Sequence, residues 1–223
     1  MALTFPQAQA RNSRLLTEIV IFGALGCAFL ALLAGTPHGA PSGIDRALMR
    51  DVQGIPWGSF SFIPRLASDI GGGIYGAYLA PAAAAVVFTV TRQWRLLALL
   101  AAVFALHYLL ISPKLFIEAN RPSPVFGVDG GGGLESFPSG HVQWATSFYG
   151  LLAFAAWRST TGRWRWAIVA ACALIVLGTM LGRMELGRHW PVDVLAGVIA
   201  GLIALRVLVV LHGIGLPRRN LSS

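Results

Sequence analysis

Three short segments of the chain place cationic side chains or histidines at the ends of long apolar runs. The first segment extends from Lys114 to Arg121-Pro122. Lys114 is the one lysine among 17 lysine and arginine residues. Because the chain uses arginine for its other basic side chains, the lysine indicates a place that needs a compact ammonium group. The alternative is a lysine that extends its amine from the end of a membrane span toward water.

The second segment, Ser136-Phe137-Pro138-Ser139-Gly140-His141, leads into another apolar run. We expect Ser139 to be the N-cap of a helix and Gly140 to let a ligand approach the backbone closely. The free N–H groups and the dipole of a helix start favour a bound anion. His141 follows in the first turn. A capped helix with an incidental histidine would give the same pattern.

The third segment, residues 182–193, contains Arg183, His189 and Asp193. Pro191 suits the first turn of a helix, which places His189 just before that helix and Asp193 in its first turn. The carboxylate could accept a hydrogen bond from the imidazole and fix its tautomer, as a nucleophilic or basic histidine requires. Alternatively, Asp193 only complements the helix dipole and His189 is an interfacial residue.

Together the three segments supply cations, two histidines, an aspartate and a helix N-terminus. This combination suits a phosphate group and its transfer. The sequence has no carboxylate cluster or Cys/His pattern of the kind that binds metals, so we expect no metal and no cofactor. Cys27 and Cys172 both lie in apolar runs, and we interpret them as small core side chains.

The elements that position these segments are membrane spans. The chain has 223 residues, of which 56% are hydrophobic and 12% charged, against roughly 25% charged residues in a soluble domain. This composition excludes a soluble enzyme, a disordered chain and a coiled coil. We predict an all-α integral membrane protein, one domain over residues 1–223, with six transmembrane helices. The predicted spans are residues 19–35, 74–90, 96–112, 142–157, 166–181 and 194–213.

The charges predict how this bundle is oriented. Nine arginines lie at one set of span ends with Glu18 as the only acid there. Under the positive-inside rule these ends and both termini are cytoplasmic. The three segments then face outward from the plasma, or inner, membrane. The net charge of +8 therefore reflects orientation, and nucleic acid is not expected as a partner.

Two further segments lie on the predicted outer face. Residues 44–52 carry apolar side chains on one helical face, which suits a helix at the membrane interface or one packed on its own protein. Gly130–Gly133 is interpreted as an outer loop that could cover the site. His107 lies inside the third span, where we expect a hydrogen-bonded core residue.

The three segments resemble the signatures of the type 2 phosphatidic acid phosphatase (PAP2) superfamily. Lys114, six residues and then Arg121-Pro122 resemble its first signature. Residues 138–141 are identical to its second, and the spacing from Arg183 to Asp193 matches its third. One position differs, because the family usually has serine where this chain has Gly182. The missing hydroxyl could alter phosphate affinity.

The resemblance implies a metal-independent lipid phosphatase that works through a phosphohistidine intermediate. His189 would attack phosphorus, Asp193 would orient it, and His141 would protonate the leaving oxygen and later activate water. The residues implied to hold the phosphoryl oxygens are Lys114, Arg121, Ser139, Gly140 and Arg183.

The substrate expected from the resemblance is a lipid phosphate or diphosphate. Undecaprenyl diphosphate is the leading candidate. Phosphatidylglycerophosphate, phosphatidate and lipid A phosphates are alternatives within the phosphatase class. A lipid-phosphate flippase or transporter is the non-enzymatic alternative. Transporters tend to place polar residues near the membrane midplane, whereas here they gather at one face, which favours a hydrolase. The sequence does not predict the oligomeric state.

Overall fold

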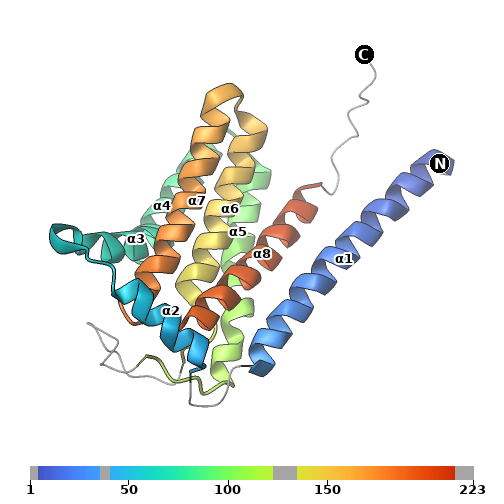
Figure 1. Ribbon diagram of the computed structural model, residues 1–223. Coiled ribbons are helices and arrows are strands. Elements are labelled where there is room, and N and C mark those ends of the chain that lie inside the picture. Colours follow the sequence, from blue (N-terminus) through green and yellow to red (C-terminus); the bar gives the residue numbers. More distant parts are fainter. Residues whose placement is uncertain (1–4, 36–40, 123–134, 214–223) are drawn as a thin grey trace.

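The computed structural model describes residues 5–35, 41–122 and 135–213, and their regular structure is helical (Figure 1). An isolated parallel bridge between Ala119 and Glu135 is the single strand-like pairing among these residues. The α-helices are α1 (Phe5–Gly35), α2 (Gly43–Gln53), α3 (Phe62–Gly72), α4 (Ala80–Val90), α5 (Trp94–Ile111), α6 (Gly140–Ser159), α7 (Gly162–Glu185) and α8 (Pro191–Gly213). The prediction of an all-α membrane bundle is confirmed.

Within the described residues, five helical segments are long and apolar enough to cross a membrane. Each of five predicted spans lies within one of them. The second begins much earlier than predicted, because the helical run starts at Gly58 and passes through α3 and a π-helical turn, Tyr75–Leu79, before α4. The remaining predicted span, residues 142–157, corresponds to α6, whose polar side chains lower its mean hydropathy.

Helix α6 lies inside the bundle and packs against α3, α5, α7 and α8. Because protein surrounds it, α6 can carry the buried polar residues Gln143, Thr146 and Ser147. Two of their hydroxyls are satisfied within the helix, since Thr146 donates to the Val142 carbonyl at 2.8 Å and Ser147 to the Gln143 carbonyl at 3.0 Å. A buried hydroxyl without such a partner would be destabilising.

Helix α8 approaches α6 closely at two glycines. A Cβ at Gly201 would lie 2.4 Å from the Thr146 Cβ, and one at Gly197 would lie 2.7 Å from the Ser139 carbonyl oxygen. Small residues allow membrane helices to pack backbone to backbone. The contact brings the N-termini of α6 and α8 together, with the Ser139 N–H donating to the Asp193 carbonyl at 3.0 Å.

Aromatic donors of α6 bind the backbone of the second span near its π-helical turn. The Trp144 indole donates to the Gly76 carbonyl at 2.8 Å, and the Tyr149 hydroxyl donates to the Ile70 carbonyl at 2.5 Å. A π-helical turn interrupts the regular hydrogen-bond ladder of a helix. These two bonds therefore attach the irregular part of the span to α6.

The predicted helix at residues 44–52 is present as α2, and it packs against α7 and α8. Asp45 and Met49 are buried, whereas Ile44 is 73% exposed and Leu48 46% exposed. The apolar face that the sequence singled out is thus the outward face. The helix packs on its own protein through the other side.

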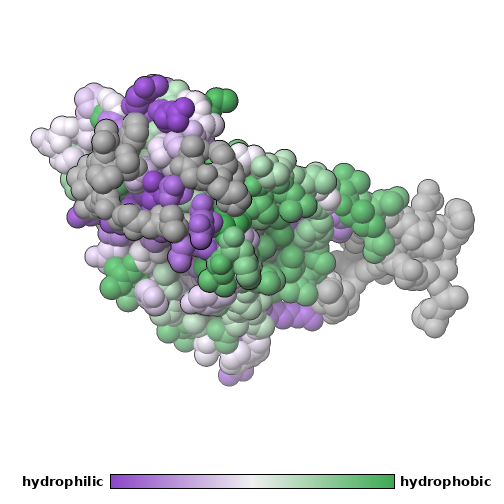
Figure 2. Space-filling model, turned by 90° about the horizontal axis from the view of Figure 1, so that it is seen from below, coloured by the Kyte–Doolittle hydropathy of each residue, from purple (hydrophilic) through white to green (hydrophobic). Residues whose placement is uncertain are grey.

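Figure 2 shows the α2 end of the molecule, where hydrophilic side chains gather beside a broad hydrophobic flank. The predicted outer loop at residues 130–133 lies outside the described residues. Of the two cysteines, Cys172 is buried as predicted, but Cys27 is exposed on α1. The core assignment of Cys27 was wrong because apolar side chains of a membrane span also face lipid.

Gly182 allows α7 to approach α3. A Cβ at this position would lie 2.3 Å from the Pro64 carbonyl oxygen, which is backbone and cannot rotate away. The side chain of the next residue, Arg183, donates to the Ser68 hydroxyl of α3 at 3.2 Å. The missing family serine is therefore explained by packing, and α3 places another hydroxyl beside the arginine.

We expect Gly182→Ser to impair the protein rather than restore a family feature. The added side chain forces α3 away from α7, at a cost of about 1–3 kcal/mol for an overpacked site, and disturbs the bond between Ser68 and Arg183. Thermal unfolding in detergent and kcat/KM should both fall. Gly23→Ser is the matched control, because a Cβ at Gly23 meets nothing within 4 Å. An unchanged melting temperature in Gly182→Ser would contradict this packing argument.

Candidate active site

The structure brings all the predicted site residues to one end of the bundle, the end where α2 lies. The first segment follows α5, the second enters α6, and the third connects α7 to α8. The residues of these segments are Lys114, Arg121, Ser139, Gly140, His141, Arg183, His189 and Asp193. Three stretches that are distant in the sequence thus form one cluster, as the predicted layout of spans required.

Two cations of the cluster are held by backbone carbonyls. The Lys114 ammonium donates to the carbonyls of Glu135 at 2.8 Å and Ser136 at 3.3 Å. The Arg121 guanidinium donates to the carbonyls of Arg188 and Glu135, each at 3.4 Å. A carbonyl fixes a cation in place without cancelling its charge. Both charges therefore remain effective toward an incoming anion.

Ser139 occupies the N-cap position of α6, with extended backbone angles of φ −70° and ψ 108°, but its side chain forms no cap hydrogen bond. The prediction that Ser139 is the N-cap is thus confirmed for its position, although its hydroxyl does not cap the helix. Ser139 is fully buried, and its Oγ has no hydrogen-bond partner among the described residues. Buried polar atoms are rarely left unsatisfied except at functional sites. The Ser139 hydroxyl is thus available for a ligand at the start of α6.

His189 is 2% exposed, and its Nδ1 lies 3.7 Å from Oδ2 of Asp193. This distance is too long for a hydrogen bond. The carboxylate instead accepts hydrogen bonds from the Ser136 hydroxyl and, at 2.9 Å, from the Trp190 N–H. The two side chains are therefore close, but the expected hydrogen bond between them is not formed. Hydrogen bonds of catalytic groups often tighten when substrate binds.

The surroundings of His189 favour its neutral form. Burial lowers the pKa of the imidazole well below its usual value, and the charges of Arg183, Lys114 and Arg121 lower it further. Desolvation and nearby cations both disfavour an imidazolium. A neutral imidazole has a free nitrogen lone pair, which is the form that a nucleophile needs.

His141 borders a cavity of about 450 Å³ between α6, α5 and the second span. Its walls include Tyr108 and Trp144, so the lining beside the imidazole is largely aromatic. His107 also lines it, with Nδ1 hydrogen-bonded to the Gln143 side-chain oxygen. The prediction that His107 is hydrogen-bonded is confirmed.

Sequence reasoning missed the contribution of α2. The buried Asp45 accepts from the Val192 N–H of α8 at 3.0 Å and from the Ser42 hydroxyl at 2.7 Å. At the other end of α2, the Gln53 amide donates to the carbonyls of Met184 and Glu185, each at 3.3 Å. Helix α2 therefore holds both ends of the loop that carries His189. Ser42-x-x-Asp45 reads as a capping box in the sequence, but it does not reveal the link to α8.

We expect Asp45→Ala to reduce turnover. The Val192 N–H loses its acceptor, which costs about 1–3 kcal/mol of stability, and the loosened loop misplaces His189. Small displacements of catalytic groups lower kcat by roughly 10- to 100-fold, so kcat should fall with little change in KM. Asp45→Asn keeps a carbonyl acceptor and should retain most of the turnover.

The matched control for this prediction is Asp51→Ala, which removes an exposed carboxylate from the same helix. Turnover should be unchanged in this variant. Equal kcat values for Asp45→Ala and the wild type, measured on the same substrate, would show that α2 has no positioning role.

The fold resembles those of two solved structures. It aligns with a PAP2-type phosphatidylglycerolphosphate phosphatase from Bacillus subtilis with a TM-score of 0.73 and 22% identity, over 88% of this chain and 98% of that one. It also aligns with LpxE from Aquifex aeolicus with a TM-score of 0.59 and 21% identity, over 75% of this chain and 96% of that one. No curated protein sequence matches the chain significantly.

The sequence itself supplies the family assignment. Residues 92–214, more than half of the chain, match the profile of the PAP2 superfamily. This range contains all three polar segments, and the two solved structures share the fold at low sequence identity. The chain belongs to the PAP2 superfamily.

Proposed function

We propose that the protein hydrolyses a lipid phosphate or diphosphate without a metal, through a phosphohistidine intermediate. The observation that carries this proposal is the burial of His189, 2% exposed and 3.7 Å from Asp193, in a cluster that also holds the cations Lys114, Arg121 and Arg183. Neutral nucleophiles and clustered cations together suit attack on an anionic phosphate. Among the described residues, no group of histidine, cysteine and acidic side chains could hold a metal ion.

In the first step, His189 attacks the terminal phosphorus and the bond from phosphorus to the leaving oxygen breaks, which is the alkoxy oxygen of a monoester or the bridging oxygen of a diphosphate. Nδ1 of His189 faces Asp193, so Nε2 is the nucleophile and Asp193 stabilises the positive charge that the ring acquires. With a monoester, His141 donates a proton to the alkoxy oxygen, so that the lipid leaves as an alcohol. A bound phosphate anion favours the protonated form of His141 because opposite charges stabilise one another.

In the second step, water attacks the phosphohistidine. His141 accepts a proton from the water, the bond between phosphorus and nitrogen breaks, and inorganic phosphate leaves. The cations, the Ser139 hydroxyl and the N–H groups at the start of α6 bind the phosphoryl oxygens in both steps. The unpartnered Ser139 Oγ supports this role for the helix start.

A lipid leaving group fits the surroundings of His141. The cavity beside it is lined mainly by apolar and aromatic side chains, which suits the part of a lipid nearest to its phosphate. We propose undecaprenyl diphosphate as the first substrate to test. The name of the Bacillus subtilis structure supports phosphatidylglycerophosphate as the alternative, followed by phosphatidate and lipid A phosphates.

We place the site on the outer face of the plasma membrane because the arginines gather at the opposite end.

A phosphate-release panel on the purified protein in detergent tests this function. The panel compares polyprenyl diphosphate, phosphatidylglycerophosphate, phosphatidate and lipid A, each with and without EDTA. We expect one of them to be hydrolysed at the same rate in both conditions, since no protein ligand set for a divalent ion is present in the described cluster. Activity that disappears in EDTA and returns with magnesium would refute the metal-free mechanism. No release from any of the four would refute the proposed phosphatase.

The roles of the histidines predict a dependence on the leaving group. A monoester expels an alkoxide, whose conjugate acid has a pKa near that of water, about 15.7, whereas a diphosphate expels a phosphate with a second pKa of roughly 6. His141→Ala should therefore slow phosphoenzyme formation far more on phosphatidate than on a diphosphate. With the diphosphate, the variant should form phosphohistidine and then stall.

Rapid-quench measurement of the phosphoenzyme on both substrates provides the comparison. His189→Ala is the control, and it should form no phosphoenzyme on either. Equal rate losses for His141→Ala on the two substrates, with binding unchanged, would exclude His141 as the general acid.

A further inference from the structure

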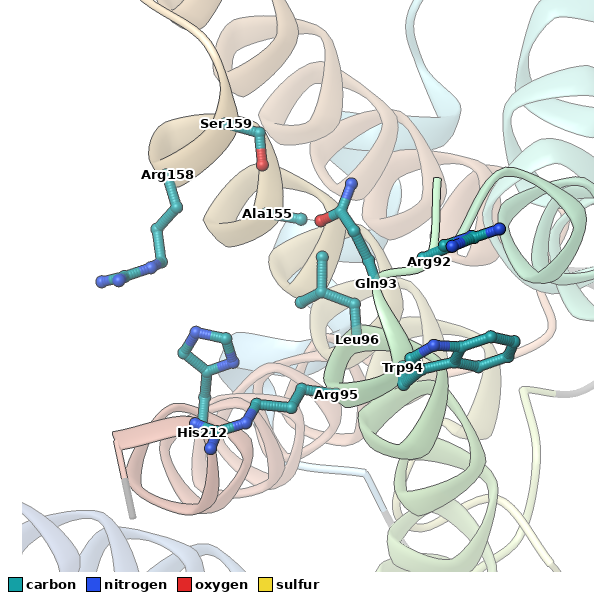
Figure 3. A pocket seen from close by; sticks show the side chains of 9 residues that line it. All are labelled: Arg92, Gln93, Trp94, Arg95, Leu96, Ala155, Arg158, Ser159 and His212. Atoms are coloured by element: carbon teal, nitrogen blue, oxygen red, sulfur yellow. The ribbon is translucent and has the colours of Figure 1, made fainter. Parts of the chain in front are cut away.

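A cavity of about 550 Å³ lies at the opposite end of the bundle from His189. Residues 92–96 at the α4–α5 turn, the last turn of α6 and His212 near the end of α8 line it (Figure 3). None of these residues takes part in the proposed chemistry. The cavity is therefore separate from the site already described.

Cationic side chains frame one side of this cavity. In Figure 3, Arg95 and Arg158 lie on either side of His212, whereas Arg92 and Trp94 point the other way. Acidic side chains are absent from the described lining. Glu18, the one acid predicted at this end, is already engaged in a two-point ion pair with Arg206 of α8. The described lining of the recess therefore contains arginines and no acidic side chain.

Two details of the recess are consistent with a binding site. Nδ1 of His212 is buried and has no hydrogen-bond partner among the described residues, and a bound water, ion or ligand would satisfy such an atom. Arg92 has a φ of 55°, a left-handed conformation that is uncommon for residues other than glycine. Strained backbone of this kind clusters at binding and active sites. Here it shapes the turn that presents Arg95.

An apolar groove continues from the cationic recess. A neighbouring cavity of about 340 Å³ shares Arg95 and His212 with it, and its remaining lining residues are Ala98, Leu99, Ala102 and Leu211. A cationic recess joined to an apolar groove matches a molecule with an anionic head and a hydrocarbon chain. A free phosphate ion would use only the first part.

We propose that these two cavities form a binding site for an anionic phospholipid, distinct from the catalytic site. The lipid phosphate lies between Arg95 and Arg158, within reach of His212, and one acyl chain follows the groove between α5 and α8. Basic recesses between membrane helices are suited to anionic headgroups. The site joins the ends of α5, α6 and α8, which carry residues of the catalytic cluster at their other ends. The alternative is that these arginines act only as orientation signals. In that case, no single arginine contributes more to lipid affinity than another.

Native mass spectrometry of the delipidated full chain distinguishes these interpretations. The probes are phosphatidylglycerol, phosphatidylcholine with the same acyl chains, and glycerol 3-phosphate. We expect phosphatidylglycerol to bind at least about fivefold more tightly than phosphatidylcholine, and Arg158→Gln to lose about fivefold of that affinity, as expected for one basic contact. Glycerol 3-phosphate should bind much more weakly, since it lacks the chain that fills the groove.

The matched control is Arg163→Gln. Arg163 is exposed and lies in the first turn of α7. Like Arg158, it stacks on one aromatic ring: its guanidinium carbon lies 5.5 Å from the ring centre of Trp164, and that of Arg158 lies 5.9 Å from the ring centre of Phe154. It does not line the recess, so its loss should leave affinity unchanged. Lipid bound at the catalytic site contributes equally in both variants and cancels in the comparison. Arg95→Gln serves as the second test variant if Arg158→Gln does not fold.

Three outcomes would overturn the proposal. Equal losses of phosphatidylglycerol affinity in Arg158→Gln and Arg163→Gln would mean that binding depends only on the overall charge of this end of the bundle. Equal binding of the two phospholipids would mean that the recess does not recognise the headgroup. Binding of glycerol 3-phosphate as tight as that of phosphatidylglycerol would identify a phosphate site without a lipid groove.

Discussion

The close approach of α6 and α8 is the contact on which the geometry of the site depends. Because Gly197 and Gly201 present no side chain, the two helices meet backbone to backbone and their N-termini lie side by side. Each helix start carries a partial positive charge. The site therefore gains two such charges in addition to its cationic side chains. A larger residue at either glycine would separate the start of α6 from the turn that carries Asp193.

The cations illustrate how neutral partners can hold a cationic site in position. Lys114 and Arg121 are held by carbonyls, and the buried Asp193 carboxylate is held by a hydroxyl and an N–H. These neutral partners fix positions while leaving the net charge of the cluster positive. Burial lowers the pKa of the His189 imidazole, and the same positive charge lowers it further. Binding and nucleophilicity thus derive from one electrostatic arrangement.

The sequence was sufficient to predict the membrane spans, apart from the early start of the second, and the composition of the cluster. Apolar run length revealed the spans, and the spacing of charged residues placed Lys114, His141 and His189 at one face. It could not reveal that Ser139 is buried without a partner, because that depends on how α8 packs over the helix start. Nor could it reveal the bond from Asp45 to Val192, since α2 and α8 are brought together only by tertiary packing. The sequence left open whether the apolar face of residues 44–52 turns toward the membrane or toward the protein, and only tertiary packing shows that Ile44 faces outward.

The π-helical turn in the second span limits how freely α6 could be redesigned. In hydrocarbon, a backbone carbonyl without a donor costs several kcal/mol, and here Trp144 and Tyr149 of α6 donate to Gly76 and Ile70. A purely aliphatic α6 of the same volume would fill the space but could not donate these hydrogen bonds. Any repacked variant of this bundle must therefore either keep a donor at both positions or make the second span a regular helix, which would change the wall of the cavity beside His141.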